Sequence, residues 1–220
     1  MVQKYPETLC YNKLYEQIYP FLSICYRSNG TFRKHRKKPV DRNDEKSIGG
    51  SRMKKNVVKE WGTAIVSALI IAAVVRLFFF APYEVLGTSM YPTLDGNELL
   101  IVNKFIYKVK NPAYGDIIVF HTNEKRDFVK RVIGLPNDRI EIHEGSVFRN
   151  GKQLKEEYIS EKILGDLDET VVPAGKLFVL GDNRNNSKDS RIIGSVSMNE
   201  VVGRADVIVL PLSRIDLLAK

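Results

Sequence analysis

WGTAIVSALIIAAVVRLFFF forms residues 61–80 and carries a single charge, that of Arg76. At ~1.5 Å per residue, a helix of this length spans about 30 Å, the thickness of the hydrocarbon core of a bilayer. Arg76 lies close enough to the end for its long side chain to reach the interface. Trp61 and Tyr83 suit the two interfacial belts, and Pro82 ends the helix. The stretch predicts one N-terminal transmembrane helix over residues 61–80.

Two alternative interpretations fit residues 61–80 less well. A buried core helix is usually shorter and is rarely apolar on all sides. A secretory signal peptide has an apolar core of about 7–15 residues and a small-x-small exit. This segment is longer and leaves through FFFAPY at 78–83, which has no such exit. A membrane anchor therefore remains the prediction.

Basic residues gather on one side of the span. Lys or Arg precede it at positions 52, 54, 55 and 59, whereas none follows it until Lys104. Flanks rich in Lys and Arg stay on the cytoplasmic side of a membrane. We therefore expect residues 1–60 to form a cytoplasmic arm and residues 81–220 to form an extracytoplasmic domain of a single-pass protein of the cell membrane.

The net charge of +8 belongs entirely to that arm. Residues 1–60 hold 14 Lys and Arg against 6 Asp and Glu, whereas the remaining chain holds 20 of each. A DNA-binding domain would normally carry its positive charge on its folded part. The basic cluster RKHRKK at 33–38 is therefore interpreted as a contact with anionic lipid. We expect membrane lipid, and no nucleic acid, among the partners.

The arm also contains a second candidate start and both cysteines. MKKNVVKEWG, from Met53, is typical of the start of an inside-anchored protein, so residues 1–52 are predicted to be an extension that activity does not need. Cys10 and Cys25 have no further Cys or His ligands nearby, so they predict no metal site. Reduced thiols suit a cytoplasmic arm.

Short strand signals dominate the chain after the span. GDIIVF (115–120), FVKRVIGL (128–135) and KLFVLG (176–181) are rich in Val, Ile and Phe and are bounded by Gly, Pro or Asp. VVGRADVIVLPL (201–212) adds a late strand. No long 3.6-residue apolar period follows residue 80. We predict an all-β domain, mostly antiparallel and barrel-like, with one N-terminal transmembrane helix.

Two other segments give local predictions. SVFRNGKQL (146–154) places Asn150-Gly151 between two short runs, and this pair favours a hairpin because a type I′ turn requires positive φ at both central residues. The acidic stretch at 156–169, EEYISEKILGDLDE, is predicted to be a surface loop or a short helix.

Few residues after the span could activate a nucleophile. His121 and His143 are the only histidines there, and neither has surroundings that favour a Ser-His-Asp triad. The chain has no HExxH motif and no Walker-type phosphate loop. A serine can instead use a lysine that burial keeps neutral.

Lys130 is the candidate for such a base, and Ser89 in GTSMYPTLDG (87–96) is the candidate nucleophile. Strand alternation places Lys130 on the apolar face and sends Arg131 to the opposite face, where it is free for an ion pair. Lowering the pKa of the lysine from about 10.4 to about 8 costs roughly 3 kcal/mol. A strand lysine more often only extends to solvent, so spacing alone leaves both roles open.

A third polar segment follows an apolar strand directly. GDNRNNSKDSR (181–191) is either a solvated turn or a loop that holds functional groups on a rigid scaffold. Its candidate side chains are Asp182, Ser187, Asp189, Ser190 and Arg191.

Over residues 53–212 the chain resembles bacterial type I signal peptidase, the leader peptidase, in its compact Gram-positive form. The resemblance rests on a basic start and a single span, followed in order by GTSMYPTL, YGDIIVF, FVKRVIGLPND and GDNRNNSKDSR. Four blocks in order after such an anchor are very specific.

The resemblance implies a serine endopeptidase with a Ser/Lys catalytic dyad. Ser89 matches the nucleophile and Lys130 the general base, and Ser187 matches a serine that hydrogen-bonds the lysine amine. Asp182, Asp189 and Arg191 match residues that support the dyad, with an Asp189–Arg191 ion pair expected. Met90 and Pro92 would shape the nucleophile turn. Some members stabilise the oxyanion with a serine at the position of Gly87, so here the second donor is open.

The implied reaction is removal of signal peptides from secreted preproteins that have small residues before the cleavage site. No metal and no cofactor is implied. Two rival interpretations are a LexA-like self-cleaving Ser/Lys protease and a non-catalytic membrane-anchored relative. The span argues against the first, and Ser89, Lys130 and Ser187 argue against the second.

Overall fold

The structure is a computed structural model that describes residues 1–4, 52–124 and 126–218; the side chains of 52–59 and 73–78 fall outside that description. Helix α2 covers Arg52–Phe79, so it begins nine residues before the predicted helix at 61–80 and ends one residue before it. Among the described residues, no helix combines the length and the apolar composition that a bilayer crossing requires. Within the predicted span at 61–80, the side chains of residues 73–78 lie outside the described part of the structure.

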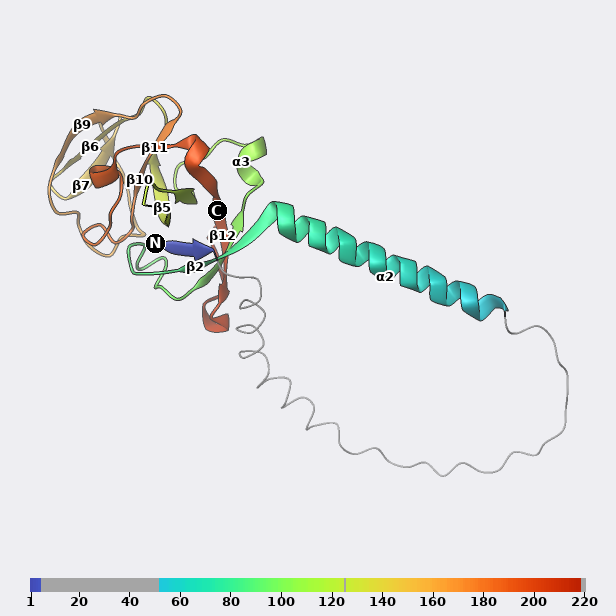
Figure 1. Cartoon of the computed structure of the whole chain (residues 1–220). Helices are drawn as coiled ribbons and strands as arrows, with labels where there is room; N and C mark the ends of the chain where they lie inside the picture. Colours follow the sequence, from blue (N-terminus) through green and yellow to red (C-terminus); the bar gives the residue numbers. More distant parts are fainter. Residues whose placement is uncertain (5–51, 125, 219–220) are drawn as a thin grey trace, which may run out of the picture. The chain divides into compact units, whose positions relative to one another are not determined.

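The rest of the described chain is mostly antiparallel β structure (Figure 1), as the sequence predicts. The larger sheet contains β1 (Val2–Lys4), β2 (Phe80–Val85), β3 (Leu99–Asn103), β4 (Ile117–His121), β5 (Asp127–Gly134), β10 (Lys176–Leu180), β11 (Val196–Ser197), β12 (Val201–Leu210) and β13 (Asp216–Leu217). The smaller sheet contains β6 (Arg139–His143), β7 (Ser146–Arg149), β8 (Lys152–Gln153) and β9 (Leu167–Val171). Short helical turns are α3 (Ile106–Val109), α4 (Ser190–Ile193), η1 (Met198–Glu200) and η2 (Leu212–Arg214).

Six strands of the larger sheet close into a barrel. Their order is β1-β2-β3-β12-β4-β5, and β5 pairs back with β1. Strand β12 makes closure possible because its ten residues pair with β4 through the first half and with β3 through the second. The predicted barrel-like domain is therefore present. Residues 2–4, which the sequence analysis assigned to the arm, form one of its strands.

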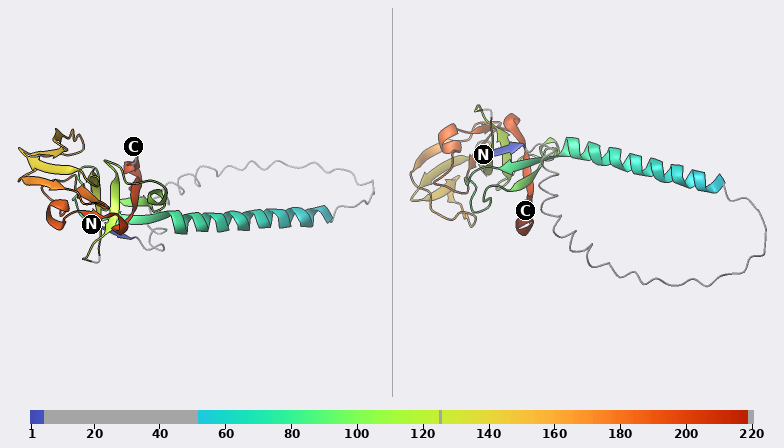
Figure 2. Two further views of the ribbon diagram at one scale, coloured as in Figure 1. Left: turned by 90° about the horizontal axis from the view of Figure 1, so that it is seen from above. Right: turned by 60° about the horizontal axis from the view of Figure 1, so that its bottom comes forward.

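The smaller sheet is held on the barrel by a shared core. Strand β10 pairs with β5 and thus belongs to the larger sheet. Its Phe178 and Leu180 lie in one buried cluster with Ile140, Ile142 and Val147 of the smaller sheet. The strands of the smaller sheet, yellow and orange in Figure 2, stay together in both views.

The predicted hairpin at Asn150-Gly151 is confirmed. Both residues have positive φ, 55° and 74°, and Arg149 of β7 pairs with Lys152 of β8 across the turn. The acidic stretch at 156–169 is mostly turns and bends, and its last residues belong to β9.

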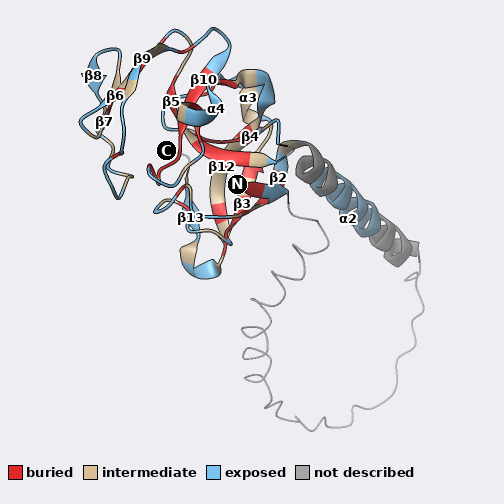
Figure 3. Cartoon of the chain, turned by 60° about the vertical axis from the view of Figure 1, so that its left-hand side comes forward, coloured by how far each residue is buried: buried red, intermediate tan, exposed pale blue. Residues whose placement is uncertain are grey.

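Strand β5 is the centre of the molecule. It has β4 on one side and β10 on the other, and most of its residues are buried on both faces (Figure 3). The run FVKRVIGL reads as nearly continuous apolar residues for this reason. A basic side chain on this strand must therefore either be buried or find a polar partner.

Candidate active site

Ser89 and Lys130 contact each other directly. Ser89 lies in the turn after β2, and Lys130 lies in the middle of β5. Lys130 Nζ is 2.7 Å from Ser89 Oγ and also donates a hydrogen bond of 2.9 Å to the Val129 carbonyl oxygen. The hydroxyl and the amine thus lie within the distance that proton transfer requires. The contact that the sequence analysis expected is present, and its catalytic role is taken up below.

Burial sets the charge state of Lys130. The residue is 1 % exposed, and its Nζ lies 5.5 Å from the centre of the Phe128 ring on the same face of β5. Burial lowers the pKa of Lys130 to about 8, against an opposing effect of Asp189 and Asp182. Neither carboxylate forms an ion pair with it in the described part of the chain. A substantial neutral fraction therefore exists at mildly alkaline pH.

The buried side chain of Met90 anchors the turn that carries Ser89. Met90 is 1 % exposed, and its carbonyl accepts a hydrogen bond from Leu94 N at 2.9 Å. Gly87 has φ of 87°, a conformation that glycine adopts without strain, and Pro92 follows a cis peptide bond. Met90 and Pro92 thus occupy the turn that they were expected to shape.

Asn183 ties this turn to the loop at 181–191. Its backbone N–H donates to the Ser89 carbonyl at 3.1 Å, and its side-chain amide donates to the Thr88 carbonyl at 3.1 Å. Both carbonyls that flank the Ser89 nitrogen are therefore held by one residue. The bond to the Thr88 carbonyl orients the peptide unit before Ser89, which contains the Ser89 N–H.

Gly181 packs against the Ser89 carbonyl, in the peptide unit that follows Ser89, with no space for a side chain. A Cβ built at this position would lie 2.2 Å from Ser187 Oγ and 2.4 Å from the Ser89 carbonyl oxygen. Both distances are far below van der Waals contact, so only glycine lets the two segments approach this closely.

Asp189 organises the loop that carries Gly181. It is fully buried, and it accepts a hydrogen bond from Gly181 N at 3.0 Å. Its carboxylate also forms the expected ion pair with Arg191, with Arg191 Nε 2.8 Å from Asp189 Oδ1. Ser190 adds a bond from Val179 N to its hydroxyl at 2.9 Å. These contacts join the loop to β10.

Asp182 accepts the guanidinium of Arg131. Arg131 Nη2 lies 2.6 Å from Asp182 Oδ2, and Thr93 donates its hydroxyl to the same oxygen at 2.5 Å. The prediction that Arg131 leaves the apolar face of β5 and forms an ion pair is confirmed. The pair links β5, the nucleophile turn and the 181–191 loop on the side of β5 opposite Lys130.

The expected hydrogen bond between Ser187 and Lys130 is not formed. Ser187 Oγ is buried and has no hydrogen-bond partner among the described residues. The Lys130 amine instead uses the Val129 carbonyl as its second acceptor. The prediction was wrong on this contact because carry-over from a motif cannot fix the rotamer of one hydroxyl, although Ser187 does lie against Gly181.

Arg184 and Glu156 form a buried ion pair that the sequence analysis did not identify. Two nitrogens of Arg184 each lie 2.6 Å from an oxygen of Glu156, and both side chains are almost completely buried. Arg184 Nε also donates to the Gly181 carbonyl at 3.1 Å. Arg184 lies inside GDNRNNSKDSR, but Glu156 lies in a stretch expected to be at the surface. No single stretch of sequence therefore indicated that the two residues would pair.

The two histidines of this domain contact other residues. His121 Nδ1 lies 2.6 Å from Asp127 Oδ1, and the ring of His143 stacks on Phe148 with centroids 4.0 Å apart. The described residues contain no group of three His, Cys, Asp or Glu side chains that could hold a metal ion.

The chain is similar to proteins of one known family. The family model described as signal peptidase, peptidase S26, matches residues 58–210. The chain belongs to this signal peptidase family. Membership makes it a serine endopeptidase, a hydrolase, in agreement with the resemblance found in the sequence.

Two relatives from Bacillus agree with this assignment. A signal peptidase I P from Bacillus subtilis subsp. natto is 43% identical over 176 residues, which cover 74% of this chain and 95% of the relative. A signal peptidase I from Bacillus caldolyticus is 48% identical, over 63% of this chain and 84% of the relative. A crystal structure of a signal peptidase I from Enterococcus faecalis V583 has 33% sequence identity and a TM-score of 0.41, and covers 44% of this chain and 97% of that one.

Proposed function

We propose that this protein removes signal peptides from secreted preproteins, with Ser89 as nucleophile and Lys130 as general base. The single observation that carries this assignment is the 2.7 Å contact between the Ser89 hydroxyl and the Lys130 amine, in a site where burial lowers the pKa of the amine. Family membership supplies the reaction, and the contact supplies the residues.

The reaction begins when the neutral Lys130 amine takes the proton of the Ser89 hydroxyl. Ser89 Oγ attacks the scissile carbonyl, and the negative charge that develops on the carbonyl oxygen is stabilised by the Ser89 N–H. The Lys130 ammonium then returns its proton to the leaving amine, which releases the mature protein. Water hydrolyses the acyl-enzyme by the reverse sequence and releases the signal peptide.

Asp182, Asp189 and Arg191 act as positioning residues. None contacts Ser89 Oγ or Lys130 Nζ; each instead holds the loop that presses on the Ser89 peptide. Ser187 joins them through its contact with Gly181.

The substrate fits this site as an extended strand beside Ser89, with small side chains before the cleaved bond. Membrane attachment brings substrate and enzyme to the same surface. Helix α2 supports a membrane anchor because its described apolar side chains, over residues 61–72, are exposed in a continuous run. In that topology the arm at 1–60 is cytoplasmic, residues 61–80 cross the membrane and the domain at 81–220 lies outside, with lipid as a partner.

The decisive experiment compares the cleavage of a synthetic preprotein by the wild type, Ser89→Ala and Lys130→Ala in detergent. Both variants should fold and bind detergent as the wild type does, and both should lose cleavage. Lys176→Ala is the matched control, because Lys176 is exposed on β10 and should be dispensable. Full activity of Lys130→Ala would refute the base assignment.

Native thiols provide a test of the topology. Cys10 and Cys25 precede the span, and no cysteine follows it. A membrane-impermeant maleimide should therefore label the protein only after the cells are permeabilised. Labelling of intact cells would place the arm outside and reverse the orientation.

A further inference from the structure

Strand β1 closes the barrel between β2, which leads to Ser89, and β5, which contains Lys130. It pairs antiparallel with β2, with Val2 opposite Val85, and the same Val2 lies opposite Asp127 of β5. The ladder continues past the strand end, where Leu86 N donates to the Met1 carbonyl at 2.8 Å. Of the described strands, β1 alone joins β2 to β5, three residues before Lys130.

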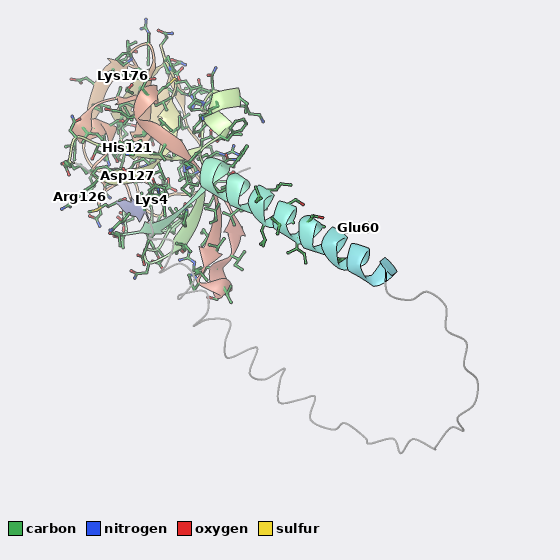
Figure 4. The ribbon with its side chains drawn as sticks, turned by 45° about the vertical axis from the view of Figure 1, so that its right-hand side comes forward. Lys4, Glu60, His121, Arg126, Asp127 and Lys176 are labelled. Atoms are coloured by element: carbon green, nitrogen blue, oxygen red, sulfur yellow. The ribbon has the colours of Figure 1, made fainter. Side chains whose placement is uncertain are left out.

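A buried side chain anchors this strand. Val2 is 2 % exposed and belongs to the buried cluster that contains Val85 and Met90. The two residues after it are exposed, and Lys4 lies in the same area as Arg126 and Asp127 (Figure 4). Val2 thus shares a cluster with Met90, the residue after Ser89, and lies opposite Asp127, three residues before Lys130.

An extended segment in this position competes with a substrate. A peptide that binds by strand addition needs free backbone groups on the receiving strand and a pocket for alternate side chains. Here the Met1 carbonyl accepts the Leu86 N–H, and Val2 is buried in the cluster with Val85 and Met90. The edges of β2 and β5 that lead to Ser89 and Lys130 are therefore occupied by the chain itself.

The proposed membrane topology excludes this arrangement. Residues before α2 and residues after it lie on opposite sides of a bilayer that α2 crosses once, whereas β1 and β2 must share one side to pair. We propose that Met1–Lys4 is an inhibitory strand that closes the substrate groove while the chain is not inserted, and that insertion of α2 withdraws it and opens the groove. This inference rests on the proposed function and adds a regulatory step to it.

The chain length allows the closed arrangement. Residues 5–51 connect β1 to α2, and 47 residues can extend to at most about 155 Å. Helix α2 has 28 residues, about 42 Å at 1.5 Å per residue. When both ends of α2 share one aqueous phase, the connection is thus long enough for β1 to dock, and a sealed bilayer between them prevents it.

A reversible cross-link tests docking without any use of activity. Val2 and Val85 form a non-hydrogen-bonded pair, because the flanking bond runs from Leu86 N to the Met1 carbonyl. Such pairs have Cα atoms about 4.5 Å apart, which a disulfide can bridge. The full chain with Val2→Cys and Val85→Cys, and with Cys10→Ser and Cys25→Ser, should oxidise to the cross-linked form in detergent. It should not do so in sealed vesicles that hold the arm inside.

Kinetics test inhibition. In detergent, Val2→Asp should lower the KM for a preprotein peptide about tenfold with kcat unchanged, because an internal strand competes through its effective concentration. Gln3→Ala, whose side chain is exposed, is the matched control and should behave as the wild type. In sealed vesicles with the domain outside, all three proteins should have the same KM. Mass spectrometry confirms that Met1 is retained.

The outcomes separate the two proposals. No cross-link in detergent, or an equal KM for Val2→Asp and the wild type there, would overturn the inhibitory strand. A lower KM for Val2→Asp in both detergent and vesicles would overturn its release by insertion. A cross-link that forms only in detergent, in a chain that cleaves no preprotein in any variant, would refute the proposed function and uphold the docking.

Discussion

The two faces of β5 hold neighbouring cations in opposite surroundings. Lys130 is buried against Phe128, and its amine contacts a hydroxyl and a backbone carbonyl. Arg131 points the other way, binds Asp182 at 2.6 Å and lies over the Tyr158 ring at 4.1 Å. Two basic residues adjacent in the chain therefore serve different purposes, because the alternation of the strand gives one of them a carboxylate and the other none.

Arg184 extends the comparison to a cation that is as buried as Lys130. Burial opposes the charge of Arg184, but hydrogen bonds to Glu156 outweigh it and raise the pKa of the guanidinium. For Lys130, burial prevails and lowers the pKa. Burial alone therefore does not make a base; burial without a paired carboxylate does. A lysine suits that role and an arginine does not.

The largest expected effect is a loss of activity when both faces of β5 carry an arginine. Lys130→Arg keeps a cation and hydrogen-bond donors at the site but removes the neutral form, so kcat should fall by about 10⁴-fold. Cleavage of a preprotein peptide measures it, with Lys176→Arg as the exposed control. Appreciable activity of Lys130→Arg would mean that a charged side chain suffices and that the base lies elsewhere.

The role of the buried Arg184–Glu156 ion pair is tested by removing one of its partners. Arg184→Met leaves Glu156 buried and uncompensated, so the free energy of unfolding in urea should fall by about 3–5 kcal/mol. The double variant Arg184→Met/Glu156→Leu should recover most of this loss. The exposed pair of Arg139 and Glu169 is the control, and Arg139→Met should cost under about 1 kcal/mol. Equal costs at both pairs would contradict the role of burial.

Gly181 tests how closely the supporting loop must approach the nucleophile. A methyl group at this position overlaps both Ser187 Oγ and the Ser89 carbonyl. Gly181→Ala should therefore displace the Ser89 peptide and reduce kcat about 10²-fold. Gly62→Ala, in helix α2 where the added methyl meets no atom within 4 Å, should be neutral. If Gly181→Ala kept full kcat, the contact would be irrelevant to catalysis.

The smallest expected effect is the rise of kcat/KM with pH, about tenfold per pH unit below the Lys130 pKa. The neutral amine is the active form, so kcat/KM should rise as pH increases and level off above the Lys130 pKa of about 8. The same shift has a consequence for stability. Because the folded pKa lies below the ordinary value of 10.5, the folded state binds fewer protons, and stability should decrease as the pH falls from about 10.5 to about 8. A profile with no rise between pH 7 and 9 would contradict the lowered pKa.

The strands that the sequence predicted are those whose own residues show an apolar strand pattern or a turn signal. The apolar runs at β4, β5, β10 and β12 and the Asn150-Gly151 hairpin needed only periodicity and turn chemistry. Strand β1 could not be predicted in this way. Three residues, VQK, have no pattern of their own, and they form a strand only because β2 and β5 both offer them a free edge.

The candidate site likewise combines residues that local motifs predicted with contacts that they could not predict. Motif blocks pointed to Ser89, Lys130 and the 181–191 loop, and the alternation on β5 separated Lys130 from Arg131. The Arg184–Glu156 pair joins residues 28 positions apart, so no short motif contains both. The expected Ser187–Lys130 bond was wrong because a hydroxyl rotamer depends on packing against Gly181.

Reading the residues alone identified the available groups: a hydroxyl, a lysine on an apolar strand, and no histidine in a supporting context. Folding then set which carboxylates reach which cations. Among the described residues it left the Lys130 amine without an ion-pair partner and placed residues 2–4 between β2 and β5. These outcomes depend on folding because a pKa and a strand partner both arise from contacts between distant segments, which the order of residues does not specify.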